Sequence, residues 1–111
     1  MTPRLAAGVW VAAYIRRLEA EGIPAHVVRR GDATAGAVIV KLATMNGSAT
    51  AFQRSFDLMS GSRAWVVLAE GPEAEVDAAL ARQAGFDPDL WVIEVEDRRG
   101  RHLLGEPGLE A

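Results

Sequence analysis

The sequence contains no cysteine and only two histidines, His26 and His102, in 111 residues. Without cysteine the chain forms no disulfide and offers neither a thiolate nucleophile nor a cysteine-ligated zinc site. Small secreted domains usually depend on disulfides, so this absence favours a reducing, cytoplasmic compartment. Two histidines also exclude a metal site built from three or more histidines of one chain.

Long apolar runs are missing as well. Residues 5–15 form an apolar run that follows Arg4, but a membrane-spanning helix needs about 20 residues. Arg16 and Arg17 follow the run at once, and no small-residue cleavage site of the kind that ends a signal peptide is present. The run therefore predicts a buried amphipathic helix, and we expect no membrane association.

The chain has no excess of basic residues, and its formal net charge is −3 at pH 7. A domain that binds nucleic acid is usually basic, so the composition argues against nucleic acid as a partner. The charge is uneven, since residues 1–55 carry +4 and residues 56–111 carry −7. Opposite charge on the two halves of the chain favours association with a partner or with a second copy. In the alternative interpretation, the two halves fold together and their charges intermix.

What is present is typical of a globular protein, with 50% hydrophobic and 24% charged residues. The length fits one domain over residues 1–111. Within it we expect a core over about residues 5–104 and a frayed tail at residues 105–111.

Hydrophobic spacing predicts two helices. Residues 5–21 place five apolar side chains on one stripe, and Gly22 and Pro24 end that helix. The stripe consists of Trp10, Val11, Tyr14, Ile15 and Leu18. A second helix is expected over residues 72–85, with a proline at its first position and a glycine at its end.

Short apolar or alternating runs predict the strands, at residues 25–30, 37–43, 48–56, 64–69 and 90–97, with a short return strand at 101–104. Asn46 and Gly47 predict a hairpin turn, because both residues accept a positive φ. Consecutive strands joined by tight turns pair antiparallel. The expected fold class is therefore α+β, a single small domain with a mostly antiparallel sheet of four to six strands and two helices packed on one face.

Several sequence blocks resemble a known family. They are Trp-Val-Ala-Ala-Tyr-Ile-Arg-Arg at 10–17, Gly-Ile-Pro-Ala at 22–25, Arg-Arg-Gly-Asp at 29–32, Ala-Gly-Ala-Val-Ile-Val-Lys at 35–41 and Phe-Asp-Pro-Asp-Leu-Trp-Val-Ile-Glu-Val-Glu-Asp at 86–97. Together the blocks resemble the small bacterial family known as domain of unknown function 1491. The resemblance implies a bacterial, cytosolic, single-domain protein, and it supplies no activity and no catalytic residue.

A basic patch is the first candidate site. If residues 25–30 and 37–43 form a hairpin, Lys41 lies across from Arg29 or Arg30, and the three cations could hold a phosphate or carboxylate ligand. Asp32 either neutralises Arg30 or shapes the turn through its side chain. The alternative is a solvated hairpin face with ordinary ion pairs. The glycines at 31 and 36 have P-loop spacing, but a strand follows them instead of the required lysine and helix, which excludes a P-loop.

Four acidic residues are weak candidates for a magnesium site, namely Asp87, Asp89, Glu94 and Glu96. Glu94 and Glu96 resemble the strand carboxylates of metal-dependent nucleases, but their strand lacks the accompanying lysine. The alternation of residues 91–96 explains the two glutamates as a solvent face, and Asp87 and Asp89 suit a turn. We therefore expect no metal ion.

Catalytic patterns are absent from the sequence, which has no Gly-x-Ser-x-Gly elbow and no visible partner for either histidine. We expect no cofactor and lean against an enzyme. The leading hypothesis is a non-enzymatic interaction module of the bacterial cytosol, acting as a homodimer or with a protein partner. The alternative is a protein or enzyme that binds a small anionic ligand through the basic patch, with or without a metal.

Overall fold

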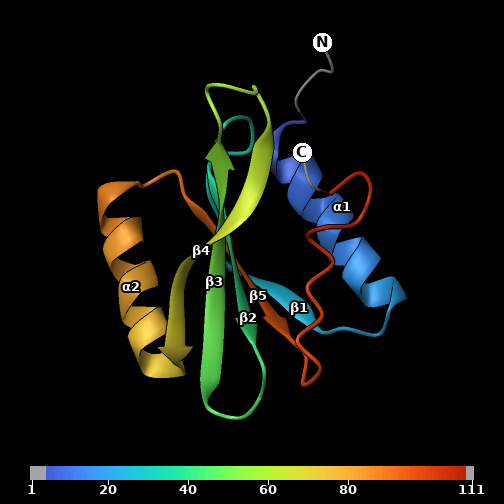
Figure 1. Ribbon diagram of the computed structural model, residues 1–111, viewed down its shortest axis with the longest axis vertical. Coiled ribbons are helices and arrows are strands. Elements are labelled where there is room, and N and C mark those ends of the chain that lie inside the picture. Colours follow the sequence, from blue (N-terminus) through green and yellow to red (C-terminus); the bar gives the residue numbers. More distant parts are fainter. Residues whose placement is uncertain (1–4, 110–111) are drawn as a thin grey trace.

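The computed structural model describes residues 5–109 as two helices and one five-stranded sheet (Figure 1). The elements follow the order α1 (Ala7–Ala20), β1 (Ala25–Arg29), β2 (Val38–Ala43), β3 (Ser48–Phe56), β4 (Arg63–Pro72), α2 (Glu73–Phe86) and β5 (Trp91–Glu96). The strands lie in the order β1-β5-β2-β3-β4, and every neighbouring pair is antiparallel except β2 and β5. The expected α+β class with a mostly antiparallel sheet is confirmed.

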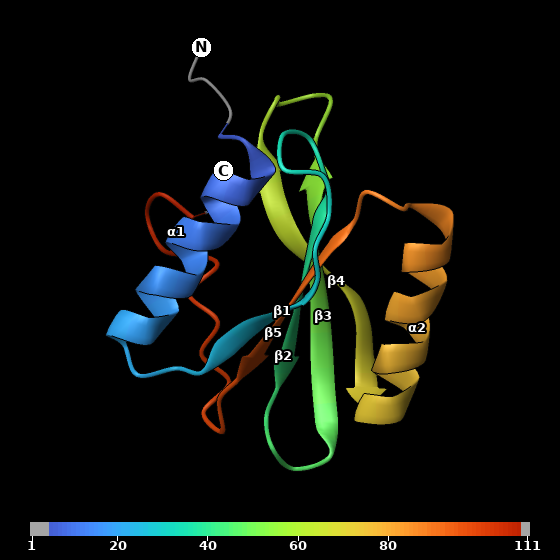
Figure 2. The same cartoon turned by 180° about the vertical axis from the view of Figure 1, so that it is seen from behind.

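The two helices lie on opposite faces of the sheet, so the expectation that both cover one face is wrong (Figures 1 and 2). Val38, Val40 and Leu42 of β2 belong to the core under α1, whereas Ile39 belongs to the core under α2. Because successive side chains of a strand point to opposite faces, these two cores lie on the two sides of the sheet. Every residue of β2 is buried as a result.

Helix α1 buries the predicted apolar stripe. Trp10, Tyr14 and Leu18 are at most 1% exposed, and Trp10 and Tyr14 stack with their ring centroids 4.8 Å apart. The Tyr14 hydroxyl donates to the His102 carbonyl at 2.7 Å, and burial raises the pKa of Tyr14 above its usual range. Among the described residues, neither helix has the length and apolar character needed to cross a membrane.

Strand β5 lies between β1 and β2, so the expected hairpin of β1 and β2 does not form. β5 pairs antiparallel with β1 and parallel with β2, and Glu94 is the residue opposite both His26 and Lys41. The sequence-adjacent strands are therefore separated by the last strand of the chain. This insertion determines which polar side chains meet on the sheet.

The β2–β3 hairpin forms where Asn46 and Gly47 predict it, but with a different turn. Positive φ angles fall at Met45 (63°) and Gly47 (90°), not at Asn46. The Asn46 side chain instead accepts hydrogen bonds from the Ser48 N–H at 3.1 Å and the Thr44 hydroxyl at 2.7 Å. Asn46 thus stabilises the turn through its side-chain oxygen.

The C-terminal segment differs from expectation in two ways. Residues 101–104 form no strand, and His102 packs on Phe52 with the ring centroids 4.7 Å apart, where burial lowers the pKa of the imidazole. Residues 105–109 are not frayed, because Leu109 is 2% exposed and its carbonyl accepts hydrogen bonds from the indoles of Trp10 and Trp65. Residues 110–111 of the expected tail lie outside the described residues.

Candidate functional site

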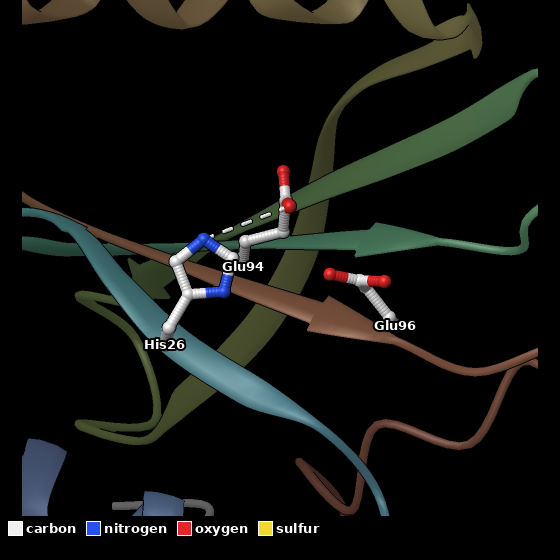
Figure 3. A group of neighbouring side chains, drawn as sticks. All are labelled: His26, Glu94 and Glu96. Carbon is white, nitrogen blue, oxygen red and sulfur yellow. Dashed lines mark ion pairs between the residues drawn. The ribbon is translucent and has the colours of Figure 1, made fainter.

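A polar cluster lies on the face of the sheet that carries α2, over strands β1, β5 and β2. His26 of β1 is paired with Glu94 of β5, and Lys41 of β2 is paired with Glu94 from the other side. Glu96 lies two residues beyond Glu94 and shares its face. Figure 3 shows His26, Glu94 and Glu96 projecting from β1 and β5 toward one another.

Lys41 is the buried centre of this cluster, with a side chain that is 5% exposed. Its Nζ lies 2.7 Å from Glu73 Oε2, 2.7 Å from Asp77 Oδ1 and 2.8 Å from Glu94 Oε1. An ammonium group has three N–H donors, so the three carboxylates use all of them. Burial by itself lowers the pKa of Lys41, but the hydrogen bonds to the carboxylates outweigh it and raise the pKa above its usual range. Lys41 stays protonated and ties α2 to the sheet.

Glu94 connects the buried lysine to the surface histidine. Its Oε1 accepts from Lys41, and its Oε2 lies 3.8 Å from His26 Nε2. The side chain of Glu94 is 20% exposed and that of His26 is 57% exposed, so the cluster opens to solvent on the side of β1. One donor atom each from His26, Glu94 and Glu96 lie within 4.8 Å of one another.

The cluster carries more negative than positive charge. Three carboxylates, those of Glu73, Asp77 and Glu94, surround the single ammonium of Lys41, and a fourth, that of Glu96, lies near Glu94. The charges of these four carboxylates and the ammonium sum to about −3, which attracts cations and repels anionic ligands. One imidazole nitrogen and two carboxylates are a donor set that can hold a divalent metal ion.

The predicted basic patch is not assembled as one surface. Strand β5 lies between Lys41 and Arg29, and the Lys41 ammonium is already paired with carboxylates. Arg29 donates to the Pro88 carbonyl at 3.1 Å, and the Arg30 guanidinium lies 5.6 Å from the ring centroid of Trp91. Asp32 Oδ2 accepts hydrogen bonds from two backbone N–H groups of the loop that follows. Asp32 therefore shapes the turn through its side chain, which is one of the two roles that the sequence suggests for it.

The four acidic candidates divide into two pairs. Asp87 Oδ1 accepts from the backbone N–H of Asp89 at 3.0 Å in the turn before β5, so this pair takes part in turn chemistry. Glu94 and Glu96 lie farther along β5 and meet His26 there. Sequence reasoning missed His26 as their neighbour, because only the pairing of β1 with β5 brings it to them. The lysine that β5 lacks is supplied by the neighbouring strand β2.

The architecture and the cluster together define a class: a small α+β domain whose mixed five-stranded sheet separates two helices and carries a His–Glu–Lys cluster on one face. Residues 5–105 match the family described as a protein of unknown function, DUF1491. The chain belongs to this family.

Solved structures support the same assignment. A crystal structure of a DUF1491 family protein from Caulobacter crescentus CB15 is 45% identical, with 93% of this chain and 95% of that chain covered and a TM-score of 0.82. Protein Atu0922 from A. tumefaciens, a structural-genomics target studied in solution, is 31% identical over 85% of this chain and 86% of its own, with a TM-score of 0.72. No curated protein matches the chain.

Proposed function

We propose that this chain is a binding module of the bacterial cytosol whose His26, Glu94 and Glu96 hold a divalent transition-metal ion. The observation that carries the proposal is the convergence of one imidazole nitrogen and two carboxylates within 4.8 Å, from two adjacent strands. Strands of a hydrogen-bonded sheet are rigid supports, so the Cα positions of the three residues need no rearrangement to bind an ion. The cytosolic location rests on the absence of cysteine.

The donor atoms favour certain metals over others. Imidazole suits zinc, iron and nickel, whereas sites of oxygen ligands alone suit magnesium and calcium. Ligand bonds of about 2.1 Å would place the three donor atoms within about 4.2 Å of one another. The donor atoms of the three residues lie within 4.8 Å of one another, which is close to that limit. Rotation of the exposed His26 imidazole can bring its nitrogen closer to the carboxylate oxygens. We therefore expect Zn²⁺ to bind more tightly than Mn²⁺ or Mg²⁺.

Lys41 would act as a positioning residue for the metal ligands. It holds Glu94 Oε1 at 2.8 Å and leaves Oε2, the oxygen that faces His26, available to an ion. A ligand carboxylate that is hydrogen-bonded on its far side keeps its orientation, which improves metal affinity. The buried ammonium also compensates part of the carboxylate charge while the site is empty.

Isothermal titration calorimetry of the metal-free protein with Zn²⁺, Mn²⁺ and Mg²⁺ tests the proposal. We expect one Zn²⁺ per chain and a higher melting temperature on binding, because an ion that binds only the folded state stabilises it. His26→Gln and Glu96→Gln should each weaken binding by at least about tenfold, which corresponds to the loss of one ligand.

Matched controls are available on the other face of the molecule. His102→Gln removes the other histidine, and Glu19→Gln removes an exposed carboxylate of α1. Both controls should bind metal as the unchanged protein does. Binding that is lost equally in the controls, or absent with all three metals, overturns the proposal.

Self-association, the function expected from the sequence, would use a different part of the molecule, the outer edge of β4. The alternative of an anionic ligand held by Arg29, Arg30 and Lys41 is not proposed, because carboxylates already surround Lys41.

A further inference from the structure

The outer edge of β4 is the longer of the two edges of the sheet. β4 is ten residues long and pairs only with β3, so among residues 5–109 its other side has no strand partner. Residues 64–69 of β4 contain no charged side chain, and Val66 and Val67 are 38% and 53% exposed. Charge and proline are usual means of protecting long edge strands, and in β4 they lie outside residues 64–69, at Arg63, Glu70 and Pro72. The stretch between them is therefore a template for pairing.

The opposite edge of the sheet is different. β1 has five residues, carries His26 and Arg29, and has an irregular register against β5 between Val27 and Arg29. Short length and charge are usual means of preventing strand addition, and β1 shows both. β4 shares the irregular register but has twice the length. The contrast between the two edges points to β4 as the side at which another strand would join.

A bulge places the two charges at the ends of this apolar stretch on one face. Arg63 is paired with Phe56 and Glu70 with Thr50, two positions of β3 that are six residues apart and therefore share a face. In a regular strand, residues seven apart such as Arg63 and Glu70 would face opposite ways. The register shift next to Ala51 adds one residue to β4 and brings Arg63 and Glu70 to the same side.

We propose that two copies of this chain pair through β4, antiparallel and centred on Val66, to form one continuous ten-stranded sheet. The twofold axis is perpendicular to the sheet, so both copies of α2 lie on the same face. In this register Val66 lies opposite Val66 of the second copy, and Trp65 lies opposite Val67. The exposed Val66 side chains of the two copies therefore meet on one face of the sheet, and each exposed Val67 meets a Trp65 of the other copy on the opposite face.

Charge complementarity identifies a second copy as the occupant. In the proposed dimer, the two bulge residues Leu68 and Ala69 of one copy lie together opposite Ala64 of the other copy. The next pair along the strands is then Arg63 of one copy and Glu70 of the other, with both side chains on the same face. Within the described residues Arg63 has no ion pair, and Glu70 only accepts a hydrogen bond from the Thr50 hydroxyl at 3.4 Å. Opposite charges directly across a strand pair stabilise the pairing, and here they do so twice.

The absence of cysteine makes the register directly testable. Directly opposed residues of antiparallel strands have Cα atoms about 4.5–5.5 Å apart, within the range that a disulfide spans. Val66→Cys in the full chain should therefore form a disulfide-linked dimer under mild oxidation. Val28→Cys, at a valine of β1 that is 56% exposed, is the matched control and should remain largely unlinked.

Charge reversal tests the same interface without a covalent link. Sedimentation of the unchanged chain over a range of concentrations should show a monomer–dimer equilibrium. Arg63→Glu or Glu70→Arg should each weaken the dimer by about tenfold or more, and the double reversal should restore it, because the pairs are re-formed with opposite polarity. Circular dichroism verifies that each variant is folded.

Specific outcomes overturn the proposal. These are a monomer at every concentration, cross-linking of Val28→Cys as readily as Val66→Cys, or a dimer that both single reversals leave unchanged. A monomer that acquires a β4 partner only from a different protein would also overturn the assignment of a second copy.

Discussion

At the scale of single residues, the stability of the polar cluster depends on Lys41, because its buried ammonium is the cation that three carboxylates share. We expect Lys41→Met to lower the free energy of unfolding by about 1–3 kcal/mol, the range for hydrogen bonds to charged groups. The value stays below that of a fully buried ion pair, since Glu73 and Asp77 are 42% and 54% exposed and water can replace part of the interaction. Urea denaturation of both proteins measures the difference.

A second change separates the lost ion pairs from lost packing. Glu94→Gln removes the least exposed of the three carboxylates. In the Lys41→Met background this change should cost less than it does alone, because Glu94 no longer has a cation to bind. Strictly additive losses would contradict a direct Lys41–Glu94 interaction.

The residues that could be predicted from the sequence are those whose partners lie nearby in the chain. Asp32 and Asp87 accept backbone N–H groups two or three residues away, and such turn chemistry is visible in a short stretch of sequence. His26 and Lys41 have partners more than thirty residues away. Their roles depend on strand order, which no local pattern encodes.

At the scale of elements, the loop of residues 31–36 is held against the start of β5. The Asp32 N–H donates to the Asp89 carbonyl at 3.0 Å, and the Trp91 indole donates to the Asp32 carbonyl at 2.8 Å. A Cβ added to Gly31 or Gly36 would overlap the Asp89 carbonyl oxygen. The two glycines therefore serve close backbone packing, a role consistent with the exclusion of a P-loop.

This packing predicts opposite signs for two alanine substitutions. Gly36→Ala should lower the free energy of unfolding by about 1–3 kcal/mol, because the new methyl group has no space. Gly85→Ala should raise the free energy of unfolding by up to about 1 kcal/mol. Gly85 lies in α2, the added Cβ would have no atom outside its own helical turn within 4 Å, and alanine favours a helix. Thermal and urea denaturation measure both, and a neutral Gly36→Ala would show that the loop is not tightly docked.

Helices and strands were predicted more accurately than their arrangement. The periodicity of α1, the apolar run of β2 and the extent of β3 are local properties, and each element forms where the sequence predicts it. The insertion of β5 between β1 and β2 is a long-range pairing. A reader of the sequence alone joins neighbouring strands into hairpins, which would place Lys41 across from Arg29 or Arg30. In the structure β5 separates Lys41 from Arg29.

At the scale of the whole molecule, the sheet separates two cores of unequal composition. The core under α1 contains Trp10, Tyr14 and Trp91, whereas the core under α2 consists of smaller side chains around Val76 and Leu80. A central strand buried on both faces shows continuous rather than alternating hydrophobicity, which indicates that both faces are covered. Apart from Lys41, the run at residues 38–43 has this character, but it does not specify which helix covers which face.

The C-terminal segment, residues 105–109, covers the aromatic core under α1. Removing that segment tests its contribution to the free energy of unfolding. A chain ending at Leu104 loses Leu109, which is 2% exposed, and the carbonyl that accepts hydrogen bonds from the indoles of Trp10 and Trp65. Truncation of one buried leucine alone costs about 2–5 kcal/mol, so the shortened chain should unfold at a clearly lower urea concentration. Its tryptophan emission should also shift to longer wavelength as the two indoles meet water. Removal of residues 110–111 alone is the control, and a shortened chain as stable as that control would contradict a structural role for the segment.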